Sequence, residues 1–180
     1  MTQRYVLLDR DGVINEDSDQ FIKTPDEWQA IPGSLEAIAM LNQHGFRVVV
    51  ITNQSGIARG LLTSATLEQI HKKMQTLATE QGGFIETIYV CPHGPDSTCD
   101  CRKPKPGLLL QFAQQHQVDL THTVFVGDSY RDIKAAQAVG ATPILVKTGK
   151  GQKTLAQYPD LNILIFDTLY DATQHLIQRP

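Results

Sequence analysis

The chain lacks any apolar run close to the ~18 residues that a membrane-spanning helix requires, so a membrane partner is not expected. It has no surplus of basic charge either, because 16 Lys and Arg stand against 19 Asp and Glu and the net charge is -3. A protein that binds nucleic acid needs a basic face for the phosphate backbone. We therefore expect no nucleic-acid partner.

Cysteine is scarce and its number is odd, with three residues confined to positions 91–101. Such a set does not resemble a disulfide framework, and a reducing compartment is the simplest setting for it. A strand expected at residues 5–8 leaves no room for a signal peptide before it. These features together lead us to expect a cytoplasmic protein.

What the chain does have is a regular alternation of apolar runs and helical patterns. Runs of β-branched and aliphatic residues predict strands at 5–8, 46–51, 85–90, 123–126, 143–146 and 163–166. Apolar residues at helical spacing predict helices at 35–44, 67–81, 108–116, 132–139 and 169–178. Strands separated by helical crossovers indicate a three-layer α/β fold, a doubly wound (Rossmann-like) parallel sheet. We expect residues 1–180 to form a single domain without a large cap.

The first polar motif, Asp9-Arg10-Asp11-Gly12, follows the first expected strand. Two carboxylates placed two residues apart on an extended chain would point the same way and repel each other without a cation or a shared proton. A magnesium ion would let Asp9 stay ionised as a nucleophile while Asp11 works as acid and base. The alternative is a solvated pair of aspartates in a turn.

Two further motifs also follow apolar strands. Thr52 is followed by Asn53, Gln54 and Ser55, whose hydroxyl, amide and backbone N–H groups suit phosphoryl oxygens, although the stretch also suits a helix cap. Asp128 fits a direct magnesium ligand. Asp132, four residues on, fits an acceptor that orients Asp128 or a bound water. The alternative for both aspartates is a favourable charge at a helix N-terminus.

Lys103 would supply the positive charge that such an acidic site needs, and Pro104 and Pro106 stiffen the segment around it. The alternative is an ordinary surface lysine. The segment just before it holds Cys91, His93, Cys99 and Cys101, a recurring ligand set for structural zinc. A disulfide or three incidental thiols are the competing interpretations. The other five histidines, at 44, 71, 116, 122 and 175, are expected at surfaces or helix ends.

These motifs together resemble those of the haloacid dehalogenase superfamily of aspartate-nucleophile phosphatases, over essentially the whole chain. Within it, residues 52–60, the Cys-x-His and Cys-x-Cys loop and residues 101–104 resemble the D-glycero-D-manno-heptose 1,7-bisphosphate 7-phosphatases. Histidinol-phosphate phosphatases, a sister group, share the zinc loop and Arg-Lys-Pro. The five residues between His93 and Cys99 match that group, so histidinol phosphate remains the alternative substrate.

The resemblance implies a Mg²⁺-dependent sugar bisphosphate phosphatase that removes the 7-phosphate in the synthesis of the lipopolysaccharide core precursor ADP-heptose. Asp9, Asp11, Thr52 and Lys103 would be catalytic. Magnesium would be held by the Asp9 carboxylate, the Asp11 carbonyl and Asp128, and structural Zn²⁺ by the Cys3His loop. Sugar contacts would come from Asp17, Ser18, Asp19 and Gln20. Asn53, Gln54 and Ser55 would also bind the substrate, through its phosphoryl oxygens.

Arg102 is expected to contact the distal part of the substrate, such as a second phosphate, because a guanidinium binds such anions bidentately. Ser129 stands where some relatives have a lysine, which leaves its role open. A binding module that has lost the reaction and a nucleic-acid 3′-phosphatase are the competing classes. The complete set of acidic and basic residues disfavours the first, and the net charge of -3 disfavours the second. We expect a monomer.

Overall fold

The computed structural model describes residues 3–178. Within this range the chain forms a six-stranded parallel sheet in the order β3-β2-β1-β4-β5-β6. The strands are β1 (Arg4–Leu8), β2 (Phe46–Asn53), β3 (Ile85–Cys91), β4 (Val124–Gly127), β5 (Thr142–Val146) and β6 (Leu164–Phe166). The chain winds outward from β1 to β3, then returns to β4 beside β1 and winds the other way. The predicted doubly wound α/β fold is confirmed.

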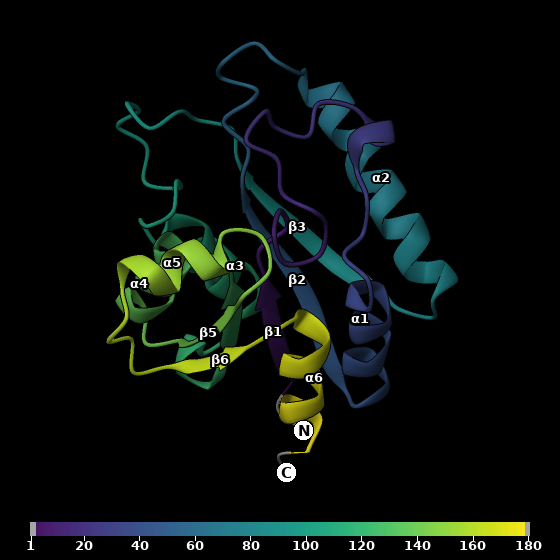
Figure 1. Cartoon of the computed structure of the whole chain (residues 1–180), viewed down its shortest axis with the longest axis vertical. Helices are drawn as coiled ribbons and strands as arrows, with labels where there is room; N and C mark the ends of the chain where they lie inside the picture. Colours follow the sequence, from purple (N-terminus) through teal and green to yellow (C-terminus); the bar gives the residue numbers. More distant parts are fainter. Residues whose placement is uncertain (1–2, 179–180) are drawn as a thin grey trace.

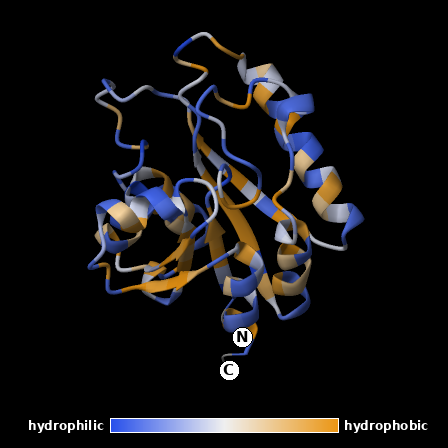
Figure 2. Cartoon of the chain, viewed as in Figure 1, coloured by the Kyte–Doolittle hydropathy of each residue, from blue (hydrophilic) through white to orange (hydrophobic). Residues whose placement is uncertain are grey.

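Helices cover both faces of this sheet (Figure 1). They are α1 (Ser34–Gln43), α2 (Ser64–Glu80), α3 (Gly107–His116), α4 (Tyr130–Ala138), α5 (Gly151–Gln157) and α6 (Leu169–Ile177). Val6 and Leu8 of β1 belong to one buried cluster, with residues of α1, α2 and α6, whereas Leu7 belongs to a second, with residues of α3 and α4. The alternation follows from the two-residue period of a strand. The central strands of the sheet are accordingly coloured mostly orange, for hydrophobic residues, in Figure 2.

The connections between strands hold only loops, turns and single helices within the described residues, in keeping with the expected absence of a large cap. A loop with a 3-10 turn (Pro25–Glu27) and α1 join β1 to β2, and α2 joins β2 to β3. Helix α5 is the one regular helix of the described residues that the sequence did not predict. No helix in residues 3–178 has the length and apolar character needed to cross a membrane.

The strand register sets the position of the polar motifs. Leu8 of β1 lies opposite Val50 of β2 and Val126 of β4, so these three neighbouring strands end close to one level. Asp9, Thr52 and Asp128 come at or just after these ends. In a doubly wound sheet, the gap between the two strands where the winding reverses is the usual ligand site.

Candidate active site

A cavity of about 240 Å³ opens at this edge of the sheet, and its lining is mostly charged and polar. It contains most of the residues that the sequence nominated for catalysis, metal and substrate: Asp9, Asp11, Asp17, Ser18, Asp19, Asn53, Gln54, Ser55, Arg102, Lys103, Asp128 and Asp132. Thr52 is fully buried and is not part of the lining, and Gln20 is exposed outside it.

Three carboxylates converge in the cavity. Asp9, Asp128 and Asp132 each offer an oxygen, and these oxygens lie within 4.8 Å of one another. Burial raises the pKa of Asp9 well above its ordinary range, and the charge of Asp132 adds to this rise. Burial and the same neighbour raise the pKa of Asp128 to about 7. The cluster therefore holds more negative charge than its surroundings compensate.

Lys103 lies between two of these acids. Its Nζ is 3.0 Å from Asp9 Oδ1 and 2.8 Å from Asp132 Oδ1, and it donates a hydrogen bond to the Ile51 carbonyl at 2.8 Å. Burial alone would lower the pKa of Lys103, but the Asp132 and Asp9 carboxylates raise it above the ordinary value. The side chain is 2% exposed, so Lys103 is a fixed internal cation and not a surface lysine.

Close backbone packing holds Asp128 in place. Its Oδ2 accepts a 2.8 Å hydrogen bond from the Lys150 amide, and its carbonyl accepts one from Thr154 Oγ1 of α5. Gly12 has φ +81°, and a Cβ there would lie 2.0 Å from Asp128 Oδ2. A Cβ at Gly149 would lie 2.3 Å from the same oxygen. Only glycine permits this approach at both positions.

Asp132 and Ser129 form a capping box at the start of α4. Asp132 Oδ2 accepts hydrogen bonds from the amides of Asp128 and Ser129 and from the Ser129 hydroxyl, at 2.9–3.2 Å. Although burial raises the pKa of Asp132, Lys103 lowers it below the usual value. One aspartate thus caps the helix, orients Asp128 and pairs with Lys103, while Ser129 serves the cap.

The Asp11 carboxylate lines the same cavity but is not one of the three converging acids. Its Oδ1 accepts from Arg10 Nη2 at 2.8 Å and from Asn15 Nδ2 at 2.9 Å, and its Oδ2 accepts from Gln54 Nε2 at 2.7 Å. Burial tends to raise its pKa, but Arg10 and these hydrogen bonds lower it on balance. An extended chain through residues 9–11 was expected to align the two carboxylates. In the structure Asp11 lies outside the converging group, and its carboxylate is held by Arg10, Asn15 and Gln54.

The end of β2 and the residue after it hold other side chains of the site in place. Gln54 Nε2 also donates to Thr52 Oγ1 at 2.9 Å. Asn53 Nδ2 donates to the Lys103 carbonyl, and the Lys103 amide donates to Asn53 Oδ1, both at 3.1 Å. The amide groups of Asn53 and Gln54, expected to contact substrate, therefore hold the lysine backbone and the Asp11 carboxylate.

The cavity also contains basic residues that the sequence did not nominate. Arg59, Arg131 and Lys150 line it together with Arg102. Burial lowers the pKa of Arg102, and the neighbouring charges of Arg131 and Arg59 add to this effect. Arg59 lies within residues 52–60 and Arg131 lies between Asp128 and Asp132, so the position of both arginines was a usable signal. Lys150 forms a 3.3 Å ion pair with Asp17.

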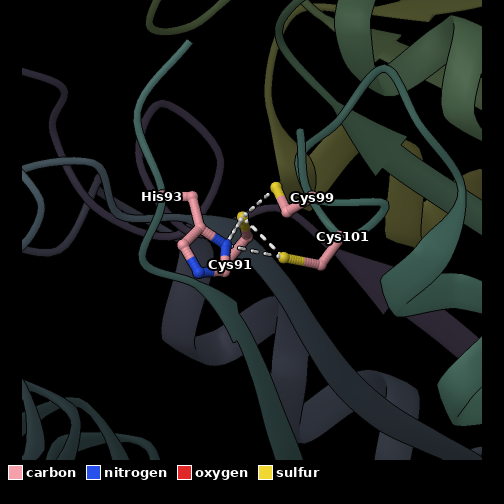
Figure 3. A group of neighbouring side chains, drawn as sticks. All are labelled: Cys91, His93, Cys99 and Cys101. Carbon is pink, nitrogen blue, oxygen red and sulfur yellow. Dashed lines mark hydrogen bonds between the residues drawn. The ribbon is translucent and has the colours of Figure 1, made fainter. Parts of the chain in front are cut away.

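The four candidate zinc ligands also converge (Figure 3). Cys91 Sγ lies 3.9 Å from Cys99 Sγ and 2.8 Å from Cys101 Sγ, and His93 Nδ1 lies 3.3 Å from Cys101 Sγ. Tetrahedral thiolates ~2.3 Å from a zinc ion would be ~3.8 Å apart. The first distance fits this value, and the Cys91–Cys101 pair would have to widen by ~1 Å. The three cysteines are free of disulfides.

Comparison with known proteins agrees with this arrangement. A family model described as haloacid dehalogenase-like hydrolase matches residues 6–84, and a second, HAD-hydrolase-like, matches residues 100–172. A D-glycero-beta-D-manno-heptose-1,7-bisphosphate 7-phosphatase of Pseudomonas putida is 55% identical, over 97% of this chain and 99% of its own. That of Pseudomonas aeruginosa is 54% identical, over 99% of this chain and 100% of its own.

A solved structure extends the similarity to three dimensions. The D,D-heptose 1,7-bisphosphate phosphatase of Bordetella bronchiseptica, complexed with magnesium and phosphate, superposes with a TM-score of 0.96. It is 49% identical and covers 98% of this chain and 99% of its own. Fold and site thus define a phosphoric monoester hydrolase of the haloacid dehalogenase superfamily. Within that class, the chain belongs to the D-glycero-beta-D-manno-heptose-1,7-bisphosphate 7-phosphatase family.

Proposed function

We propose that this protein is a magnesium-dependent phosphatase that removes the 7-phosphate of D-glycero-D-manno-heptose 1,7-bisphosphate. One observation supports the metal most directly. Asp9, Asp128 and Asp132 bring three negative charges and Lys103 brings one positive charge, so minus three plus one leaves minus two. A divalent cation would balance this charge and keep Asp9 ionised. The Asp9 carboxylate, the Asp128 carboxylate and the Asp11 carbonyl would hold it.

Asp9 acts as the nucleophile and forms an aspartyl-phosphate as the bond to the sugar oxygen breaks. Asp11 gives a proton to the departing sugar oxygen, then takes one from the water that attacks the aspartyl-phosphate. Lys103 lies 3.0 Å from Asp9 and stabilises negative charge on the phosphoryl oxygens. Magnesium, when bound, supplies further positive charge at those oxygens. Thr52 would contribute its hydroxyl, whose oxygen already accepts a bond from Gln54.

The second phosphate of the substrate would bind Arg102, Arg59 and Arg131. All three line the cavity with the acidic cluster, and the cluster itself would repel a phosphate without them. Guanidinium groups bind phosphate bidentately, so three of them favour a bisphosphate over a single phosphate ester. Asp17, Ser18 and Asp19 would contact the sugar from the loop after β1. Histidinol phosphate, the alternative substrate, carries no second phosphate for this cluster.

A substrate panel tests the proposal. Heptose bisphosphate should give a higher kcat/KM than heptose 7-phosphate and histidinol phosphate. Arg102→Ala should reduce the bisphosphate preference by about tenfold. Arg47→Ala, at the opposite end of β2, is the control and should leave this ratio unchanged. A wild-type preference for histidinol phosphate would contradict the substrate, and an unchanged ratio in Arg102→Ala would contradict the arginine site.

We also propose that the Cys3His cluster binds structural zinc. Burial and the nearby Cys91 and Cys99 thiols raise the pKa of Cys101 to about 12, whereas a hydrogen bond with Ser97 lowers the pKa of Cys99 to about 6. A bound cation would favour the ionised form of Cys101. The set offers four ligands and leaves no open coordination position. Zinc would hold the loop that leads from Cys91 to Arg102 and Lys103. Free thiols at this site favour a reducing compartment such as the cytoplasm.

A further inference from the structure

Arg10, between the proposed nucleophile and the proposed acid, is buried without any exposed surface. Its Nε and Nη2 both donate to Asp11 Oδ1, at 3.1 and 2.8 Å. Its Nη1 lies 3.1 Å from Nε2 of His71, a buried residue on α2. A buried arginine requires partners for its donors. His71 was expected at a surface or helix end. It is instead one of the two partners that hold this guanidinium.

The contact fixes the protonation of His71. A guanidinium can only donate hydrogen bonds, so Nε2 of His71 must accept from Arg10 and carries no proton. The ring is therefore neutral, with its proton on Nδ1. Burial, followed by the positive charge of Arg10, lowers the pKa of His71 to about 3. His71 thus serves as a permanent acceptor that fixes the guanidinium plane.

The guanidinium in turn distinguishes the two oxygens of Asp11. Oδ1 accepts from Arg10 twice and from Asn15 Nδ2 at 2.9 Å, so three N–H groups point at it. A hydroxyl hydrogen on Oδ1 would meet these three hydrogens. Oδ2 accepts from Gln54 Nε2 at 2.7 Å and retains a free lone pair. A proton on the Asp11 carboxyl group therefore belongs on Oδ2.

We infer that Arg10 and His71 are positioning residues that dedicate Oδ2 of Asp11 to proton transfer. This inference rests on the proposed function, in which Asp11 is the acid. In the first step an Asp9 oxygen bonds to phosphorus, the bond from phosphorus to the sugar oxygen breaks, and the Oδ2 proton moves to that oxygen. In the second step Oδ2 takes a proton from water as the water oxygen bonds to phosphorus. The bond to Asp9 then breaks and phosphate is released.

Two variants of His71 separate positioning from simple packing. His71→Gln places a side-chain oxygen where Nε2 stands and keeps the acceptor, whereas His71→Leu removes it. Loss of alignment should matter most for a poor leaving group that needs the proton. We expect His71→Leu to lower kcat/KM for heptose bisphosphate by about tenfold or more, and that for p-nitrophenyl phosphate by less than about threefold. His71→Gln should recover most of the loss.

Ile70→Val, at the preceding buried position of α2, is the control because it removes one buried methylene and keeps the His71 side chain that contacts Arg10. Its ratio of the two kcat/KM values should equal that of wild type. Equal losses on both substrates in His71→Leu, or no recovery in His71→Gln, would overturn the inference. Asp11→Asn tests the proposed function separately by the burst of p-nitrophenol in the first turnover. With p-nitrophenyl phosphate the variant should retain the burst, because this leaving group needs no proton, whereas release of the sugar from heptose bisphosphate should become slow. Equal losses of first-turnover rate on the two substrates would refute the acid role.

The protonation of His71 can also be measured in the wild-type protein, without a variant that might fail to fold. The ¹⁵N shifts of the His71 ring at neutral pH should report a neutral ring protonated on Nδ1. A charged ring, or a proton on Nε2, would remove the acceptor that holds Arg10 and would overturn the inference.

Discussion

Asn53 and Lys103 are 50 residues apart in sequence and exchange two hydrogen bonds of 3.1 Å between the asparagine side chain and the lysine backbone. The carbonyl of Ile51, two residues before Asn53, accepts a bond from Lys103 Nζ. The end of β2 therefore holds both the backbone and the ammonium group of the lysine. The position of Lys103, the proposed catalytic cation, therefore depends on a strand that lies next to β1, the strand just before the proposed nucleophile Asp9.

Replacing Asn53 by alanine should cost turnover as well as stability. The change leaves the Lys103 amide and carbonyl without partners, at a cost of about 1–3 kcal/mol, and lets the lysine shift. A small displacement of a catalytic group can lower kcat by on the order of 100-fold.

Asn42→Ala is the matched control. Asn42 also makes two side-chain bonds to backbone, to the Phe46 carbonyl and from the Phe84 amide, at the opposite edge of the sheet. Thermal unfolding should show similar losses for the two variants, and kcat should fall only in Asn53→Ala. Equal kcat in both variants would show that Asn53 does not position Lys103.

The extent to which the sequence predicts this architecture differs from element to element. Strands such as Phe46–Asn53 were predictable because a buried parallel strand needs a continuous apolar run. Helix α5, Gly151–Gln157, was not, because its seven residues GQKTLAQ show no apolar periodicity. This helix is fixed by tertiary contacts, among them the bond from Thr154 to the Asp128 carbonyl.

The candidate site shows the same division. The acids and the lysine were predictable because each has a motif beside a strand end or a proline-stiffened loop. The role of His71 was not predictable, because the sequence around one histidine in a helix does not indicate that it contacts an arginine 61 residues away. Nor does the sequence show that the side-chain amides of Asn53 and Gln54 form hydrogen bonds with Lys103 and Asp11.

Asp132→Asn should weaken magnesium binding and retain part of the hydrogen bonding that caps α4. Asparagine retains one oxygen for the cap, but it loses the charge that pairs with Lys103 at 2.8 Å and that orients Asp128. Loss of a residue that orients a metal ligand typically lowers metal affinity about 10–100-fold. The magnesium concentration that gives half-maximal activity should rise by this factor.

Asp171→Asn controls for the loss of a cap, because Asp171 and Thr168 form the same capping box at the start of α6. That variant should leave the magnesium requirement unchanged. An unchanged requirement in Asp132→Asn would mean that Asp132 serves only the helix.

The stability of the metal-free protein should depend on pH through Asp128. Burial raises its pKa to about 7 in the folded chain, against an ordinary value of ~3.9. The folded chain then binds more protons than the unfolded chain between these values, so stability should fall as pH rises from about 4 to about 7. Magnesium binds the ionised form and should raise the unfolding temperature more at about pH 8 than at about pH 5.5. An equal increase at both pH values would contradict the proposed ligand.

Removal of zinc should destabilise the fold as well as lower activity. A chelator selective for zinc over magnesium should release one zinc per chain and lower the unfolding temperature by about 10 °C, because the Cys3His ligands lose the ion that joins them. Calorimetry before and after metal removal, with zinc added back, measures this effect. An unfolding temperature that does not change on zinc release would indicate that the ion has no structural role.

The most direct test of the account is the stereochemistry at phosphorus. Asp9, which lies beside Lys103 in the acidic cluster, is the proposed nucleophile of a two-step transfer. Each in-line displacement inverts phosphorus, so attack by Asp9 followed by attack of water gives net retention. Hydrolysis of a 7-phosphate made chiral with oxygen isotopes should therefore yield phosphate of retained configuration. Inverted phosphate would mean that water attacks the substrate directly and that Asp9 forms no covalent intermediate.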